Sequence, residues 1–251
     1  MNKYFFKLII LMIFVTPFSS KSAFAQELKL QALTEDWPPY NYLENGKVTG
    51  IGVEIVNLVL KKANIQADIK IYPWARAYII ATNEPNVLIF TIGRTPEREK
   101  LFKWIGKIAP RKMNLFKLKK RHDIIVNSLN DAKKYSIGVV RNSTSHLSLK
   151  NLGFESDGKL SIVSKDIQNL KMLFLGRIDL MAGNELALSY MSKNNNYNYS
   201  NLERGLLLSD DGHYYFALSN KTDEKIIQLL KNAYTELETT GVLDSIREKY
   251  Q

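Results

Sequence analysis

Hydrophobic and polar residues alternate with a period of two over residues 28–32 and again over residues 67–71. This alternation is typical of strands that bury one face. Between them, apolar residues recur every three or four positions over residues 53–63, which predicts a helix. A further helix is expected over residues 74–83, and the apolar run 87–90 predicts a buried strand. Strands and helices that alternate with short connections predict an α/β layer with a mainly parallel sheet.

The same alternation starts again after a basic stretch at residues 111–122. The expected strands are 113–118, 136–140, 160–163 and 178–182, and the expected helices are 145–151, 166–175 and 185–193. The clearest helix of the chain lies at residues 226–237, where apolar positions are three or four residues apart, and a short helix is expected over 242–250. Two α/β units of this size predict two lobes, with a ligand cleft at the carboxyl ends of the strands.

The first 25 residues have the three parts of a secretory signal peptide. Lys3 and Lys7 give a basic start, residues 8–15 are an unbroken apolar run, and Ala23 and Ala25 flank Phe24 in a small-x-small cleavage pattern. The run is much shorter than the roughly 20 residues that span a bilayer, so cleavage is expected rather than anchoring. The mature chain is then expected in the periplasm.

The composition limits the chemistry that the chain can perform. Its 251 residues include 35 Lys and Arg against 25 Asp and Glu, and the formal net charge of +10 suits a polyanion, an anionic membrane face or small carboxylated ligands. Export argues against nucleic acid as a partner. The absence of cysteine excludes disulfides, thiolate zinc sites and cysteine nucleophiles, and the three histidines have no metal-ligand spacing. No metal and no cofactor are expected.

Five segments occur in an order and at separations typical of one family. They are TEDWPPYNYLENGKVTGIG at 34–52, TIGRTPERE at 91–99, IGVVRNSTS at 137–145, GRIDLMAGNE at 176–185 and YTELETTGVLDSIREKY at 234–250. Together they resemble the family 3 extracellular solute-binding proteins, the periplasmic receptors of polar amino-acid ABC importers. The resemblance implies a type II clamshell of two α/β lobes, each a mainly parallel sheet flanked by helices. Residues 26–115 and 210–251 are expected in lobe 1, and residues 116–209 in lobe 2.

An aromatic-proline cluster at residues 37–40 comes just after the first strand, and its prolines hold the rings in place. The resemblance implies that Trp37 stacks on the ligand, with Tyr40 and Tyr42 as second choices. The alternative is that these rings only cap the edge of the core.

Arg94 and Arg98 flank a turn at the end of the next predicted buried strand. A guanidinium binds a carboxylate through two parallel hydrogen bonds. The resemblance places Arg98 on the family's carboxylate-binding arginine, although either arginine could instead pair with a surface acid. Thr91 and Gly93 are expected to add a hydroxyl and a backbone amide on the same side of the cleft.

On the second lobe, Ser143 and Thr144 follow a strand and open a helix. Unpaired amides at a helix N-terminus bind anionic oxygens, and the resemblance implies that this turn holds the same carboxylate as Arg98. Simple capping of the helix is the alternative. Arg141, just ahead, is an additional cation that faces either the cleft or solvent.

Asn184 is a departure from the pattern of amino-acid receptors, which usually carry an aspartate at this position to neutralise the ligand's ammonium. A neutral amide binds an ammonium less strongly than a carboxylate does. Glu185 next to it, Asp210 or Asp211 could take over this contact. An anionic ligand without an ammonium is therefore a second hypothesis beside an amino acid.

The sequence favours a monomeric, non-catalytic receptor that captures a small polar or carboxylated solute by lobe closure and delivers it to an ABC permease in the inner membrane. Two alternatives stay open. One is a periplasmic partner of a ligand sensor. The other is an enzyme resembling the cyclohexadienyl dehydratases on the same fold, for which Glu185 and His146 are the candidate acid or base.

Overall fold

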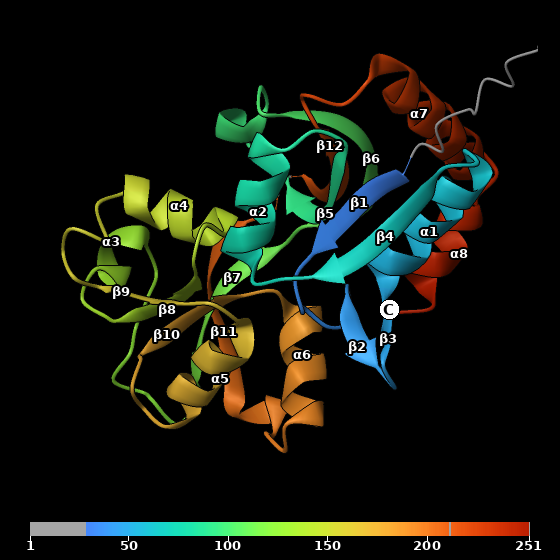
Figure 1. Cartoon of the computed structure of the whole chain (residues 1–251). Coiled ribbons are helices and arrows are strands. Elements are labelled where there is room, and N and C mark those ends of the chain that lie inside the picture. The colour runs from blue at the N-terminus through green and yellow to red at the C-terminus, as the bar shows by residue number, and fades with distance from the viewer. Residues whose placement is uncertain (1–28, 211, 251) are drawn as a thin grey trace, which may run out of the picture.

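The computed structural model describes residues 29–210 and 212–250, so the expected signal peptide at residues 1–25 lies outside the described residues. The described chain forms two five-stranded sheets with helices on both faces, arranged side by side as two lobes (Figure 1). The first lobe contains both ends of the described chain, coloured blue and red, and the second contains its middle. The predicted two-lobed α/β fold is thus confirmed.

The sheet of lobe 1 has the strand order β4-β1-β5-β12-β6. Its strands are β1 (Lys29–Thr34), β4 (Gln66–Ile71), β5 (Val87–Gly93), β6 (Phe102–Pro110) and β12 (His213–Ser219). Its helices are α1 (Ile51–Lys62), α2 (Trp74–Asn83), α7 (Glu224–Thr239) and α8 (Val242–Glu248). A hairpin of β2 (Tyr42–Glu44) and β3 (Lys47–Thr49) precedes α1, and the 3-10 helix η1 (Pro96–Arg98) follows β5. Helices α1, α7 and α8 pack together, whereas α2 packs on β5, β1 and β12.

Strand β5 lies in the centre of this sheet, and all of its residues are buried. Leu88 and Phe90 belong to the apolar cluster that includes α1 and α7, whereas Ile89 and Ile92 belong to the cluster that includes α2. The alternation is interrupted at Thr91, where φ is 61° and the register with β12 shifts. A bulge of this kind redirects a side chain, and a positive φ is unusual for a β-branched residue. Thr91 is therefore held in a special conformation at the carboxyl end of the strand.

The sheet of lobe 2 has the strand order β11-β7-β10-β8-β9. Its strands are β7 (Met113–Leu118), β8 (Ile137–Val140), β9 (Leu160–Val163), β10 (Leu180–Gly183) and β11 (Leu202–Ser209). Its helices are α3 (Leu129–Ala132), α4 (Thr144–Asn151), α5 (Asp166–Phe174) and α6 (Glu185–Asn194), and the 3-10 helix η2 (Tyr199–Asn201) precedes β11. Apolar residues of α5 and α6 belong to one core cluster, and those of α3 and α4 belong to another.

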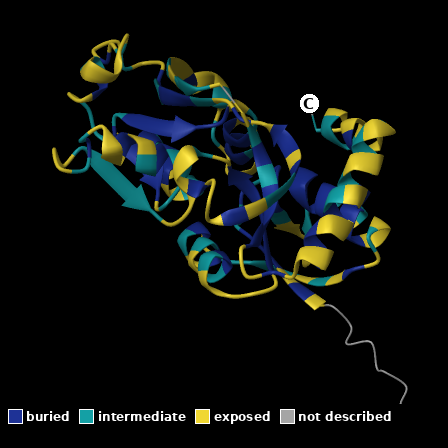
Figure 2. Ribbon diagram, turned by 90° about the horizontal axis from the view of Figure 1, so that it is seen from above, coloured by how far each residue is buried: buried dark blue, intermediate teal, exposed yellow. Residues whose placement is uncertain are grey.

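Two crossings join the lobes, one between β6 and β7 and one between β11 and β12. The second sheet already begins at Met113, which pairs with Ser209, so the first crossing lies a few residues before the expected lobe boundary at 116. Each sheet combines parallel pairs, such as β1 with β5 and β8 with β9, with antiparallel pairs formed by strands next to the crossings. The central strands β5, β8 and β10 are buried, the edge strands β4, β9 and β11 are partly exposed, and the helices expose their outer faces (Figure 2). Among the described helices, none combines the length and apolar character needed to cross a membrane.

Candidate functional site

A cavity lies between the lobes at the carboxyl ends of β1, β5, β8 and β9. Lobe 1 contributes Glu35, Trp37, Trp74, Thr91, Gly93, Arg98 and Tyr214. Lobe 2 contributes Met113, Val139, Val140, Ser143, Thr144, Ser145, Asp166 and Ala182. Because each lobe supplies about half of the lining, any ligand in the cavity would contact both lobes.

Arg98 is the most deeply buried charged residue of this cavity, with an exposed fraction of 1%. Its guanidinium donates one hydrogen bond to the Gly93 carbonyl at 3.0 Å and another across the cleft to the Asn142 carbonyl at 2.7 Å. Its Nε has no hydrogen-bond partner, and burial lowers the pKa of the group. No described carboxylate lies within 4.0 Å of it, so this arginine is positioned to bind an anionic group from outside the protein.

The rings of Trp74 and Tyr78 hold Arg98 in place, since the guanidinium carbon lies 5.7 Å and 5.0 Å from their centroids. Trp74 also donates its indole N–H to the Asn142 carbonyl at 2.9 Å. Two lobe 1 side chains thus converge on one carbonyl of lobe 2. Asn142 presents that carbonyl from a left-handed conformation with φ of 60°, which asparagine tolerates better than most residues.

Helix α4 begins opposite Arg98. Ser143 caps it by accepting a hydrogen bond from the His146 amide at 3.1 Å, as N-cap serines do. The amides of Thr144 and Ser145 lie in the first turn, where a helix offers no internal acceptor. All three residues line the cavity. The arrangement can hold a carboxylate between a guanidinium and the positive end of a helix dipole.

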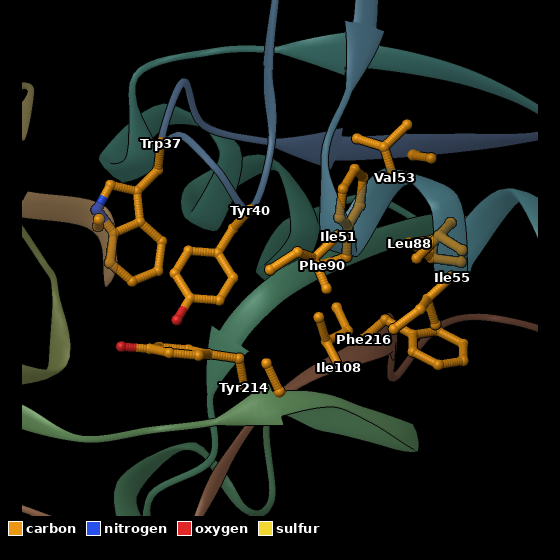
Figure 3. Packing of buried hydrophobic residues seen from close by; sticks show 14 of the residues in the cluster. Trp37, Tyr40, Ile51, Val53, Ile55, Leu88, Phe90, Ile108, Tyr214 and Phe216 are labelled. Atoms are coloured by element: carbon orange, nitrogen blue, oxygen red, sulfur yellow. The ribbon is translucent and has the colours of Figure 1, made fainter. Parts of the chain in front are cut away.

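Three aromatic rings form one end of the cavity region. Trp37 stacks on Tyr40 with ring centroids 4.5 Å apart, and both rings contact Tyr214. In Figure 3 the polar atoms of the three rings point away from the aliphatic core residues, such as Ile55 and Leu88. The rings therefore close the core of lobe 1, and Trp37 and Tyr214 also line the cavity; stacking of Trp37 on a ligand stays a prediction.

Two carboxyl groups line the cavity, one from each lobe. Glu35 follows β1 on lobe 1, and Asp166 opens α5 on lobe 2. Burial, followed by the negative charges of Asp166 and Asp36, raises the pKa of Glu35 well above its usual range, while Arg98 opposes this shift. Burial raises the pKa of Asp166 to about 7 against a smaller opposing effect of the Trp37 indole N–H. The Trp37 indole N–H is thus near enough to the Asp166 carboxyl to influence its pKa. The two groups do not form a hydrogen bond of regular geometry.

Six of the site residues predicted from the sequence line this cavity. They are Trp37, Thr91, Gly93, Arg98, Ser143 and Thr144. Gly93 is required by the close approach of the lobes, because a Cβ atom at this position would lie 2.7 Å from the Thr144 Cγ2. The Thr91 hydroxyl is hydrogen-bonded to the Asn41 side chain.

The other predicted site residues lie outside the lining. Arg94 is exposed and forms a bidentate pair with Glu99, at 2.7 and 2.5 Å. Arg141 is also exposed. Glu185 is exposed at the start of α6 and pairs with Arg204 at 3.2 Å.

Asn184 is used by the fold itself. Its Oδ1 accepts the Ala187 amide at 3.2 Å, which caps α6, and also the Tyr40 hydroxyl at 3.2 Å across the cleft. Its Nδ2 donates to the Lys112 carbonyl at 3.1 Å. The hydrogen bond between Tyr40 and Asn184 thus joins the two lobes beside the cavity. Of the two aspartates considered as substitutes, Asp210 is exposed and Asp211 lies outside the described residues.

His146, the other candidate for acid–base chemistry, is buried behind the α4 turn. Its Nδ1 accepts the Asn142 amide at 3.0 Å, and burial lowers its pKa. It does not line the cavity. No group of three or more His, Cys, Asp or Glu that could hold a metal ion occurs in the part of the chain that the structure describes.

Sequence reasoning missed Glu35, Trp74, Asp166 and Tyr214. A signal existed for the two acids, because each follows a parallel strand at its carboxyl end, where a cleft was expected. Their burial could not be inferred from the sequence, since an acid beside a strand end is more often solvated.

The family model of the bacterial extracellular solute-binding proteins, family 3, matches residues 31–251. Among curated proteins, the probable amino-acid-binding protein YxeM of Bacillus subtilis (strain 168) is 25% identical over 215 residues, covering 84% of this chain and 79% of its own length. The L-cystine-binding protein TcyA of the same organism is 24% identical over 218 residues, covering 85% of this chain and 77% of its own length.

Solved structures share the fold. An ancestral arginine-binding protein bound to arginine has a TM-score of 0.76 at 20% identity and covers 88% of this chain and 97% of its own. A histidine kinase sensor domain with similarity to periplasmic binding proteins has a TM-score of 0.77 at 17% identity, covering 88% of this chain and 94% of its own.

Proposed function

We propose that this chain, which belongs to family 3 of the bacterial extracellular solute-binding proteins, captures an amino acid or a related small carboxylated solute between its lobes. It then delivers the solute to an ABC importer in the inner membrane. Closure is coupled to binding because the ligand's contacts are divided between the lobes, so the closed form gains interactions that the open form lacks. The protein performs no reaction on the solute.

Arg98 is the observation that carries this proposal. It is buried between the lobes, it has no described carboxylate partner, and the α4 N-terminus faces it. An arginine buried without a countercharge is costly to the protein alone. A ligand carboxylate supplies the missing charge and the acceptors for its hydrogen bonds.

The relatives support the ligand class. YxeM and TcyA are named for binding an amino acid and L-cystine, and one structural neighbour was solved with arginine bound. Membership in an extracellular family supports export. We further propose that the signal peptide is cleaved after residue 25 and that the mature protein acts as a monomer in the periplasm.

Calorimetric titration of the mature protein with the twenty L-amino acids and simple organic acids tests the proposal. The Arg98→Ala variant should bind the best ligand weaker by about 2–5 kcal/mol, because a desolvated carboxylate loses its partner. Arg98→Lys should recover only part of this loss, since lysine cannot bind bidentately. Arg94→Ala removes an exposed arginine of the same loop and should leave the affinity unchanged. Unaltered affinity in a folded Arg98→Ala protein would refute the assignment.

A further inference from the structure

We infer that the cavity holds a cationic nitrogen of the ligand between Glu35 and Asp166, so that the ligand is a zwitterion whose ammonium does not use position 184. This inference rests on the proposed function. It concerns which end of the ligand lies where, and which carboxyl groups replace the aspartate that Asn184 lacks.

The sequence neighbours of the two acids form an ion pair with each other across the cleft. Asp36, next to Glu35, pairs across the cleft with Lys165, next to Asp166, at 3.2 Å. Lys165 is therefore paired with Asp36 and not with Glu35 or Asp166. Glu35 and Asp166 line the cavity, and neither has a Lys or Arg nitrogen within 4.0 Å among the described residues.

Such a pair is unfavourable when both groups are charged and the cavity is empty. Two like charges repel more strongly in a poorly solvated cavity than in water, because the surroundings screen them less. The raised pKa values of both groups follow from burial and, for Glu35, from the nearby negative charges of Asp166 and Asp36. An ammonium placed between the carboxyls replaces this repulsion by attraction. Because it then binds one carboxylate on each lobe, it favours the closed form.

The same cavity also contains a positively charged group. Arg98 lines the cavity, its exposed fraction is 1%, and its Nε has no hydrogen-bond partner. Arg98 is near enough to Glu35 to oppose the rise of its pKa. One small cavity thus offers a site for an anion and a site for a cation. An amino acid or another amino carboxylate satisfies both, whereas a simple carboxylic acid satisfies only one.

Asn184 does not compete for this role. Its Oδ1 already accepts two hydrogen bonds, from the Ala187 amide and the Tyr40 hydroxyl, and its Nδ2 donates to the Lys112 carbonyl. A ligand ammonium at this position would have to break one of these contacts, because the amide has no free acceptor directed at the cavity.

Matched probes test the inference. The best-binding amino acid from the titration above is compared at pH 8 with its des-amino carboxylic acid and with its decarboxylated amine. The wild type should bind the amino acid at least 100-fold more tightly than the des-amino acid. Asp166→Asn and Glu35→Gln should each weaken binding of the amino acid at least tenfold and leave the des-amino acid unaffected or bound more tightly. Glu185→Gln is the matched control, because Glu185 is an exposed acid paired with Arg204.

Two further results keep the test decisive. Binding of the amino acid near pH 7 should release protons, because the ammonium favours the charged form of both carboxyls. The number of protons released is obtained from the heat of binding in buffers of different ionisation enthalpy. Charged or titratable neighbours of the pair are Asp36, Lys165, Arg98 and Tyr214.

Equal affinity for the des-amino acid, or no proton release together with unchanged binding in both variants, would overturn the inference while an Arg98-dependent receptor stands. Failure of every probe to bind in an Arg98-dependent way would overturn the proposed function, and the inference with it.

Discussion

The two lobes build their sides of the cavity by different means. On lobe 1, large side chains pack on one another: Trp37 stacks on Tyr40, and Trp74 and Tyr78 hold Arg98. On lobe 2, no aromatic ring of the described residues lines the cavity: the lining comes from residues of strands β7, β8 and β10, from the small polar residues at the start of α4, and from Asp166 at the start of α5.

We propose that this difference reflects different roles of the two lobes in ligand binding. The packed rings of lobe 1 fix Arg98 and Trp37 before any ligand arrives, so that little ordering is needed on binding. The helix starts of lobe 2 add backbone amides and a carboxyl that reach the ligand only when the lobes close. On this proposal, lobe 1 provides the initial binding surface, and lobe 2 provides the contacts that depend on closure.

The largest expected effect is on the packing of lobe 1. Trp37 is only 6% exposed and contacts Tyr40 and Tyr214, so Trp37→Ala should lower the free energy of unfolding by about 3–5 kcal/mol. Trp37→Phe keeps an aromatic ring and should lose much less. Chemical denaturation of both variants measures the difference. An Ala variant as stable as the Phe variant would show that lobe 1 is not preorganised by this ring.

The next effect concerns closure. Gly93→Ala places a Cβ atom 2.7 Å from the Thr144 Cγ2, which obstructs the closed form but not an open one. We expect ligand affinity to fall by about 1–3 kcal/mol, in the range of core overpacking. Thr144→Ser removes that methyl group, and the double variant should recover part of the affinity in calorimetry. If Gly93→Ala binds normally, the ligand does not require the lobes to approach this closely.

A smaller effect follows from the partly buried carboxyl of Asp166 in lobe 2. The pKa of Asp166 is raised to about 7, so between about pH 4 and pH 7 the folded protein holds a proton that the unfolded chain has released. The contribution of Asp166 to stability therefore falls as the pH rises through this window, by at most about 1.4 kcal/mol per pH unit. Without ligand, Asp166→Asn should be more stable than the wild type at pH 8, with a smaller difference at pH 5. Thermal melts of both proteins at the two pH values measure this difference in stability. The same difference at pH 5 and pH 8 would contradict a raised pKa of Asp166.

The smallest effect is expected at the rim. Lys165 and Asp36 pair across the cleft at 3.2 Å, but both side chains are more than a third exposed. Exposed pairs typically contribute 1 kcal/mol or less, so Lys165→Ala should change ligand affinity by about that amount and lose even this at high salt. A loss as large as that in Arg98→Ala would mean that the outer pair, and not the buried arginine, controls closure.

Much of the fold could be predicted from periodicity. The helices expected over residues 74–83, 145–151 and 185–193 lie within one residue of α2, α4 and α6. Strands β6, β11 and β12 were not predicted. They pair antiparallel with strands distant in sequence, and register shifts interrupt the alternation of β11 and β12 with their partners. Long-range pairing and bulges therefore conceal a strand from a local pattern.

The site was less predictable than the fold. The resemblance led to Arg98, which lies in the cavity, but four residues away an arginine of the same loop faces solvent and pairs with Glu99. Only tertiary packing separates the two. The capping role of Asn184 follows a local preference of helix N-termini, whereas its contact with Tyr40 joins residues 144 positions apart. A departure from a family pattern is thus understood only when its new partners are known.

The most direct measurement is a crystal structure of the mature protein with its best-binding amino acid. The ligand should lie between the lobes, with its carboxylate on Arg98 and the first-turn amides of α4. Its ammonium should lie between Glu35 and Asp166. A ligand whose carboxylate does not contact Arg98, or that lies outside this cavity, would contradict the account.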